Sequence, residues 1–384
     1  MIIDLLDGDL YAGDPAPVYA WLREHAPVYH DAANGLWGIS RHADVSAIER
    51  DPKLWTSTAG YRPQLPSEPS MIGLDDPEHA ARRRLVHRRF TPHHVRDAYA
   101  GRVREVVAEQ LDRALEKGAV DAVAELAAPL PARMIGWLLG FPEEDWPRLK
   151  HWSETTIVAG GGLRYVTHEA AVAAGEYGQA VLELAAERRA RPRGDLLSLW
   201  CASPDYDDER LANEALLLLD GGAETTRTVI ATAIDALIRH PRQWRLLRED
   251  PGLMEGAVEE FIRWTTPILN MCRTATRDTR LHGRPIPAGA QVLLMYGAAN
   301  RDPEVFAEPE AFDVTRRPGG HIAFGLGTHF CLGAALARLE LRIFFEEWVA
   351  RVREASWADG RGPRILPNAF VRGVTSFPIE LRPR

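Results

Sequence analysis

The chain has 384 residues, 46% of them hydrophobic, which is enough to bury a large core. Its formal net charge of −8 argues against a general nucleic-acid-binding protein. Only three cysteines occur (Cys201, Cys272 and Cys331), and they are too few and too far apart for a disulfide scaffold. The first residues contain neither a basic region nor a long apolar run, so we expect no signal peptide or membrane anchor. No segment has the composition of a linker. We therefore expect one cytoplasmic domain over residues 1–384.

The N-terminal part predicts a hairpin followed by a loop. Residues 27–39 contain strand-forming side chains on both sides of a turn at residues 32–35. Residues 56–70 are polar and rich in Pro and Gly, which indicates a loop. This loop, with the following Met71 and Ile72, either covers a pocket or is a simple surface connection.

A helix is expected to begin after Asp76 and Pro77, because these residue types are favoured at the N-cap and in the first turn. His79 and Arg83 lie four positions apart, so they share one face of this helix. Further arginines extend the positive charge, and most of them are expected on a solvated face.

Residues 95–191 predict several amphipathic helices, which prolines and a glycine triplet at 160–162 interrupt. The triplet is expected to form a mobile segment over a cavity. The next helix, over residues 207–238, is expected to be the longest. Its middle carries Gly221-Gly222-Ala223-Glu224-Thr225-Thr226, and two adjacent glycines followed by hydroxyls favour a local bulge or kink. Asp220 stands among leucines, and it either faces a cavity as a polar anchor or satisfies a partner elsewhere.

Glu260 and Arg263 carry opposite charges on one helix face, a pattern that surface ion pairs share. After a break at Pro267, residues 268–273 and 291–295 predict strands.

The stretch Phe324-Gly325-Leu326-Gly327-Thr328-His329-Phe330-Cys331-Leu332-Gly333 combines a tight glycine loop with a cysteine just before a helical pattern. A helix N-terminus favours a thiolate, which can ligate a metal such as haem iron. A dinucleotide-binding loop would need a third glycine where Phe330 stands. A buried inert cysteine is the remaining alternative.

Three motifs resemble those of the cytochrome P-450 superfamily. Residues 324–333 match its haem-binding signature Phe-Gly-x-Gly-x-His-x-Cys-x-Gly, and residues 221–225 match its oxygen-activation motif. Glu260-x-x-Arg263, with Arg316, is similar to its buried Glu-x-x-Arg triad. The resemblance implies a mainly α fold with a small β region, haem b as cofactor, and monooxygenase activity.

The same resemblance assigns roles to individual residues. Cys331 would be the axial iron ligand, and Glu224 and Thr225 would deliver protons. The remaining haem contacts would come from His79, Arg83, Arg273, His329, Phe324, Gly325 and Gly333. The first four of these would bind the propionates. One departure is Asp75-Asp76-Pro77, where the family commonly has Asp-Pro-Pro.

Within the superfamily, residues 263–273, 327–333 and 368–373 look like those of actinobacterial sterol side-chain hydroxylases. We therefore expect a hydrophobic substrate, such as a sterol or terpenoid, bound by Ile268, Leu269, Met71, Ile72, Leu218 and Ala223. A secondary-metabolite tailoring oxidase is the alternative in the same class. A non-catalytic haem-thiolate sensor would not need Glu224 or Thr225, and a peroxide-driven relative would lack that pair.

The chain has no room for a flavin domain, so electrons would come from a separate ferredoxin-type carrier and its reductase. Its docking patch would include Arg82, Arg84, Arg88 and Arg338.

Overall fold

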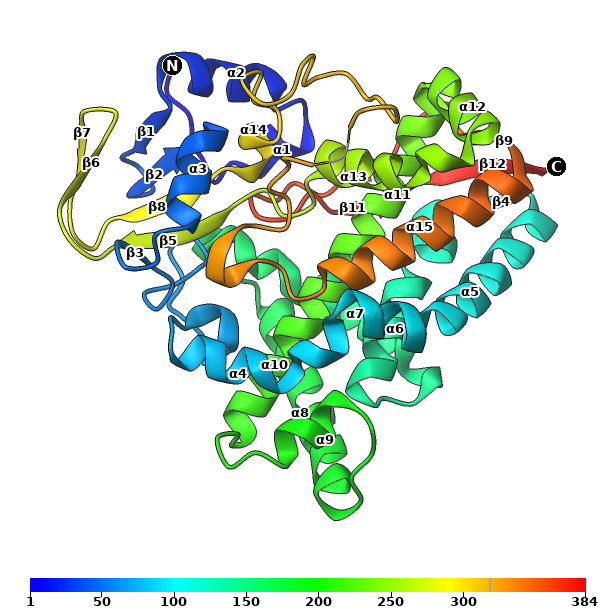
Figure 1. Cartoon of the computed structure of the whole chain (residues 1–384), viewed down its shortest axis with the longest axis horizontal. Coiled ribbons are helices and arrows are strands. Elements are labelled where there is room, and N and C mark those ends of the chain that lie inside the picture. Colours follow the sequence, from blue (N-terminus) through cyan, green and yellow to red (C-terminus); the bar gives the residue numbers. More distant parts are fainter. Residues whose placement is uncertain (318) are drawn as a thin grey trace.

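The computed structural model describes residues 1–317 and 319–384 of the chain. It shows a mainly helical molecule whose largest β-sheet occupies the corner at the upper left of Figure 1. The predicted fold class is therefore confirmed. The helices are α1 (Gly8–Ala12), α2 (Ala16–His25), α3 (His42–Glu49), α4 (Glu78–His87), α5 (Pro92–Lys117), α6 (Pro129–Leu139), α7 (Trp146–Thr156), α8 (His168–Ala190), α9 (Leu196–Cys201), α10 (Asp208–Leu219), α11 (Thr225–Arg239), α12 (Pro241–Glu249), α13 (Met254–Thr265), α14 (Tyr296–Ala299) and α15 (Ala334–Arg351).

The strands form several small sheets. They are β1 (Val28–Asp31), β2 (Leu36–Ile39), β3 (Trp55–Thr56), β4 (Ala119–Asp121), β5 (Met271–Ala275), β6 (Thr279–Leu281), β7 (Arg284–Ile286), β8 (Gln291–Leu294), β9 (Val352–Trp357), β10 (Arg364–Ile365), β11 (Val374–Ser376) and β12 (Pro378–Pro383). The largest sheet has the order β1-β2-β8-β5-β3. Its first pair is the predicted hairpin, in which Val28 faces Ile39. Strand β8 runs parallel to β2 and antiparallel to β5, so the chain must return from the helical part to complete this sheet.

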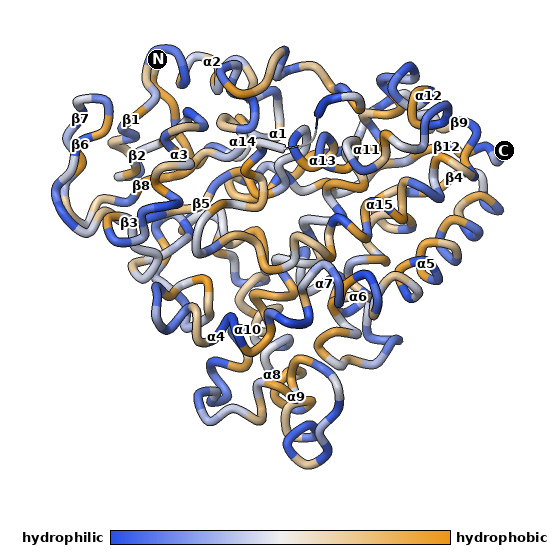
Figure 2. Tube along the Cα trace, viewed as in Figure 1, coloured by the Kyte–Doolittle hydropathy of each residue, from blue (hydrophilic) through white to orange (hydrophobic). Residues whose placement is uncertain are grey.

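Helices α10 and α11 run through the middle of the molecule as one rod, joined by a π-helical turn at Asp220–Glu224 (Figure 1). The Asp207 carboxylate caps the N-terminus of α10 by accepting from the Arg210 N–H at 2.9 Å, as the sequence predicts. The predicted bulge is also confirmed, because the wide turn includes both glycines of the motif. Figure 2 shows hydrophobic residues along the inner helices and hydrophilic residues at the outer connections.

The predicted Glu260 triad is buried beside this rod. Arg263 donates to both Glu260 oxygens at 2.7 and 2.8 Å, and the Arg316 side chain lies 3.2 Å from the same carboxylate. Arg263 also donates to the backbone oxygens of Asn300, Pro309 and Ala311. The triad therefore joins α13 to the irregular segment that leads to residues 324–333.

Among the described residues, none of the helices combines the length and the apolar character needed to span a membrane.

Candidate active site

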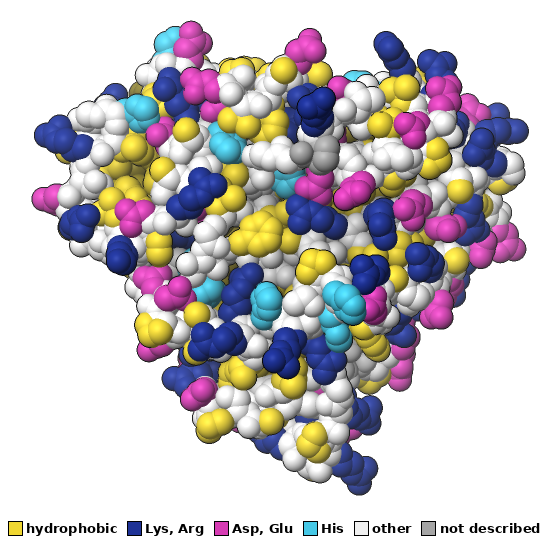
Figure 3. All heavy atoms as spheres, in the orientation of Figure 1, with side chains coloured by type: hydrophobic (Ala, Val, Ile, Leu, Met, Phe, Trp, Pro, Cys, Tyr) yellow, Lys and Arg dark blue, Asp and Glu magenta, His cyan; other side chains and the backbone are white. Residues whose placement is uncertain are grey.

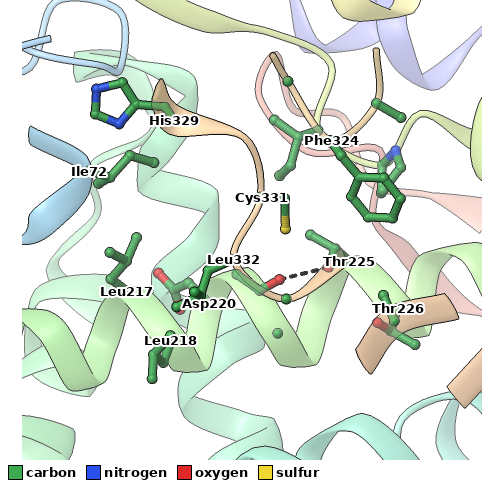
Figure 4. Close-up of a pocket in the computed structure, with 18 of the residues that line it drawn as sticks. Ile72, Leu217, Leu218, Asp220, Thr225, Thr226, Phe324, His329, Cys331 and Leu332 are labelled. Atoms are coloured by element: carbon green, nitrogen blue, oxygen red, sulfur yellow. Dashed lines mark hydrogen bonds between the residues drawn. The ribbon is translucent and has the colours of Figure 1, made fainter. Parts of the chain in front are cut away.

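A large cavity lies between the α10–α11 rod and the loop at residues 324–333. Its walls include Cys331 from that loop, Thr225 from α11 and Met71 from the segment before α4. Figure 4 shows Cys331 on one side of this space, with Asp220 and Thr225 of the helical rod on the other. The cavity leaves about 1590 Å³ that protein atoms do not fill, part of it open to solvent.

The loop that carries Cys331 requires glycine at two positions. Gly325 and Gly327 both have φ +64°, in the left-handed region. A Cβ on Gly327 would lie 2.4 Å from the backbone oxygen of Glu49, so the loop packs against the end of α3. The Cys331 N–H donates to the Phe324 carbonyl at 2.8 Å and closes the loop. Backbone geometry therefore fixes the position of the thiol.

The environment of Cys331 affects its thiol in two opposite directions. Burial raises the pKa of the Cys331 thiol, whereas the N–H groups of Gly333 and Ala334 and the charge of Arg83 lower it. The net effect is a raised pKa, so these protein groups alone do not hold a thiolate. A metal cation bound to the sulfur would supply the missing positive charge.

Three of the four predicted propionate-binding residues gather beside this loop. The rings of His79 and His329 lie 4.4 Å apart, and the Arg83 guanidinium donates to the Phe330 carbonyl at 2.6 Å. The His79 ring contacts the Asp76 carboxylate at 3.2 Å. Burial, together with the nearby charge of Arg273, lowers the pKa of His329 to about 2, so this imidazole is neutral.

The fourth residue, Arg273, forms a buried ion pair with Glu49 at 3.2 Å and is not part of the cavity wall. The same Glu49 carboxylate accepts from the Leu326 N–H at 2.9 Å and from the Tyr296 hydroxyl. Arg273 therefore reaches the cysteine loop through Glu49.

The helical motif places its hydroxyl in the cavity wall and its acid elsewhere. Thr225 lines the cavity, and its hydroxyl donates to the Gly221 carbonyl at 2.7 Å, the dashed line in Figure 4. Glu224 is 2% exposed and accepts from Arg227 at 2.6 Å, and Arg227 also pairs with Glu154 of α7. Burial raises the pKa of Glu224 to about 7, with Arg227 opposing the shift. In this conformation the carboxylate points to its arginine.

Four of the six predicted substrate residues line the cavity: Met71, Ile72, Leu218 and Ile268. Leu269 and Ala223 do not. Leu269 packs in the core beside the N-terminal residues Leu5 and Leu6, because neighbouring residues of an extended segment face opposite sides. Ala223 packs in the main helical core, on the other face of the rod.

A buried arginine and a buried glutamate of the cavity wall were not predicted. Arg62 comes from the loop before α4, and no sequence motif marks it. Glu340 lies on α15 and is 2% exposed, and burial raises its pKa to about 8. A single acid between Leu339 and Leu341 was the signal that could have identified it. Asp220, left open by the sequence, also lines the cavity.

This donor set fits a haem. One thiol faces open space on a loop shaped by glycines, and a Cβ on Gly333 would lie 4.0 Å from its sulfur. Cationic and imidazole side chains stand to one side, where they can bind carboxylates, and apolar side chains form the remaining wall.

Comparisons with known proteins agree with this geometry. The profile of the family described as Cytochrome P450 matches residues 178–355. A steroid C26-monooxygenase of Mycobacterium tuberculosis (strain ATCC 25618 / H37Rv) is 40% identical to this chain, over 99% of this chain and 97% of the relative. A vitamin D(3) 25-hydroxylase of Pseudonocardia autotrophica is 35% identical, over 98% and 97%. The solved structure of CYP109E1 from Bacillus megaterium in complex with testosterone is similar with a TM-score of 0.89 and 30% identity, over 97% of this chain and 99% of that chain.

Proposed function

This chain belongs to the cytochrome P450 family and is a haem-thiolate monooxygenase with haem b as its cofactor, and from that premise we propose that it hydroxylates a steroid or a related polycyclic terpenoid. The observation that carries this substrate class is the apolar wall around Cys331, formed by side chains such as Met71, Leu218 and Ile268. The names of the relatives support it, since two of them act on steroids or vitamin D.

Cys331 would hold the iron, and the residues around it would hold the propionates. When bound, haem b supplies the activation of dioxygen and the insertion of one oxygen atom into the substrate. Arg83, His79 and His329 line the cavity and would contact the propionates directly. Arg273 would assist by orienting Glu49 and the loop. Phe324, Gly325 and Gly333 would form the haem-facing wall of the loop.

Thr225 and Glu224 would supply protons to the reaction in the cavity. The Thr225 hydroxyl lies in the wall, where it can position a water molecule. Glu224 has a pKa raised to about 7 by burial, which suits a carboxyl group that takes up and releases protons near neutral pH. It must leave Arg227 to do so, because Arg227 holds it at 2.6 Å in this conformation.

We further propose one domain over residues 1–384, in the cytoplasm, where its three free cysteines stay reduced.

The family requires an electron donor, and a ferredoxin-type protein with its reductase is the proposed one. Figure 3 shows Lys and Arg side chains over α4, the helix that carries Arg84 and ends just before Arg88. The exposed Phe330 lies nearby, since Arg83 of the same helix contacts its carbonyl. An acidic carrier fits this surface.

Arg82, expected from the sequence to be part of the docking patch, does not present its charge at the surface. Its guanidinium turns inward, where it donates to the Pro69 carbonyl at 2.8 Å and pairs with the buried Glu214 at 3.4 Å. Arg338 is partly engaged as well, because it makes two hydrogen bonds to Glu259 at 2.6 and 2.8 Å.

The test combines one spectrum with one product assay. Haem-loaded protein, reduced and treated with carbon monoxide, should show the red-shifted Soret band of thiolate ligation, and Cys331→Ser should lose it. Cys272→Ser is the matched control, because Cys272 is fully buried in a strand and should leave the band unchanged. With ferredoxin, reductase and a reduced nicotinamide cofactor, a panel of steroids should yield hydroxylated products by mass spectrometry. Turnover of macrolides or other secondary metabolites in place of every steroid would favour the tailoring-oxidase alternative.

A further inference from the structure

We propose that Arg62 and Asp220 form a polar anchor inside the substrate cavity, which binds a hydroxyl group of the substrate and so selects and orients hydroxylated polycyclic molecules. The inference rests on the proposed function and adds a substrate feature that the apolar wall does not specify. It concerns residues far apart in the sequence, one in the loop before α4 and one at the start of the π-helical turn.

The Arg62 guanidinium is a buried cation that donates no hydrogen bond within the part of the chain that the structure describes. The residue is 9% exposed and lines the cavity, and its Nε has no acceptor. The nearest carboxylate oxygens belong to Glu68 at 3.7 Å and Asp220 at 3.8 Å, both beyond hydrogen-bond distance. A guanidinium has five N–H donors, and leaving them unsatisfied in a buried place costs free energy. A ligand that supplies an acceptor oxygen would remove this cost.

Aromatic rings hold the Arg62 guanidinium at this place. The guanidinium carbon lies 5.2 Å from the centre of the Tyr61 ring and 5.4 Å from that of Phe370, distances typical of cation–π contacts. Tyr61 is itself fixed, because its hydroxyl donates to Glu68 at 2.7 Å. The cation is therefore preorganised beside the cavity and does not need to move from solvent when a ligand enters.

Asp220 supplies the complementary acceptor. Its Oδ1 accepts from the Thr156 hydroxyl at 2.7 Å, whereas its Oδ2 has only the distant Arg62 among the described residues. The side chain is 3% exposed and stands in the cavity wall with Leu217 and Leu218, as Figure 4 shows. One oxygen is thus used for structure, and the other remains for a ligand.

The two groups together favour a hydroxyl over other functional groups. A hydroxyl can accept from Arg62 and donate to Asp220 Oδ2 at the same time. A ketone can only accept, so it would leave Asp220 Oδ2 unsatisfied, and a hydrocarbon would leave both groups unsatisfied. A carboxylate would face the like charge of Asp220, and an amine would face the like charge of Arg62. The expected order of affinity is alcohol, then ketone, then hydrocarbon.

The experiment uses cholestanol, cholestanone and cholestane, which differ only in this functional group. The dissociation constants of the haem-loaded protein are measured from the Soret shift and, independently, by equilibrium dialysis. Wild type should bind cholestanol about tenfold or more tightly than cholestane, because the alcohol supplies hydrogen-bond partners to both charged groups and the hydrocarbon supplies none. Cholestanone should fall between them.

Asp220→Leu and Arg62→Met should each remove most of the preference for cholestanol, and the double variant should lose little more, because the two groups act as a unit. Arg191→Met, an exposed arginine at the end of α8, is the matched control and should keep the preference. Equal affinities of wild type for the three molecules, or a preference that survives in both single variants, would overturn the anchor. If one variant fails to bind haem, the order of the three dissociation constants of wild type and the result for the other single variant still decide whether the anchor exists.

Failure of the proposed function gives a different result from failure of the anchor. If no cholestane derivative binds, the steroid proposal is lost, and the anchor is then tested with borneol against bornane, a smaller terpenoid pair. An equal response to that pair would overturn the anchor as well. If steroids are hydroxylated but the three cholestanes bind equally, the proposed function stands and the anchor alone is refuted.

Discussion

Two buried clusters of arginine and carboxylate differ in how completely they are hydrogen-bonded. In the first cluster, Arg263 holds Glu260 with bonds of 2.7 and 2.8 Å, and Arg316 adds a third contact at 3.2 Å. In the second, Arg62 lies 3.7 Å from Glu68 and 3.8 Å from Asp220, and its Nε has no acceptor. Both arginines are buried, at 2% and 9% exposed.

This difference in hydrogen bonding indicates that the Arg263 cluster stabilises the fold, whereas the Arg62 cluster is available to bind a ligand. Taking charges out of water is costly, and only good hydrogen-bond geometry offsets that cost. Arg263 meets this condition and joins α13 to the segment before the cysteine loop, so its removal should affect the fold. Arg62 does not meet it, and it faces the cavity, so its removal should affect ligands.

The largest expected effect is that of Arg263→Met. This change leaves Glu260 buried with a weaker partner, which should lower the free energy of unfolding by about 3–5 kcal/mol. The measurement is a urea titration of the haem-loaded protein, followed by circular dichroism and by the Soret band. Arg62→Met is the matched control and should change the free energy of unfolding by less than about 1 kcal/mol. Similar losses in the two variants would erase the distinction between the clusters.

The pair of Glu224 and Arg227 lies between these two cases. Its contact is short, at 2.6 Å, yet it belongs to the motif beside the cavity. Glu224→Gln keeps the volume and a hydrogen-bond acceptor, so folding should persist, but turnover should fall about a hundredfold, equivalent to about 2.7 kcal/mol.

Thr225→Val should keep oxygen consumption and divert reducing equivalents to hydrogen peroxide. The measurement is product and peroxide formed per reduced cofactor consumed, and unchanged coupling in Thr225→Val would refute its role in proton delivery.

The sequence predicts the first cluster better than the second for a physical reason. Glu260 and Arg263 are one helical turn apart, so helix geometry alone brings them together. The turn at Gly325 and Gly327 and the bulge at Gly221 and Gly222 likewise follow from local backbone preferences.

Arg62 and Asp220 are 158 residues apart, and their meeting depends on how the loop before α4 packs on the rod. The partners of Arg82 and Arg273, which are Glu214 and Glu49, depend on tertiary packing in the same way. The face occupied by Leu269 also follows from such packing, because the sequence shows only an apolar pair at 268–269.

The smallest expected effect is a pH dependence that belongs to the second cluster. Burial raises the pKa of Asp220 from 3.8 to about 7, although the charge of Arg62, 3.8 Å away, opposes this shift. Between about pH 4 and pH 7 the folded protein therefore keeps a proton that the unfolded chain has released. The contribution of Asp220 to stability falls as the pH rises through this range, and it is constant above it.

Asp220→Asn removes this titration and keeps an oxygen that can accept from Thr156. The variant should therefore gain stability relative to wild type by about 1 kcal/mol as the pH rises from about 5 to about 6, because one proton changes the free energy of unfolding by about 1.4 kcal/mol for each pH unit in this range. The charge of Asp220 is one of the causes that raise the pKa of Glu224, so the two proteins are compared in the Glu224→Gln background. Glu340 titrates near neutral pH in both proteins, and the difference between the two unfolding curves then isolates Asp220. A difference that does not change with pH would mean that Asp220 is ionised throughout this range. Arg62 would then hold the carboxylate as firmly as Arg263 holds Glu260, and the two clusters would be of the same kind.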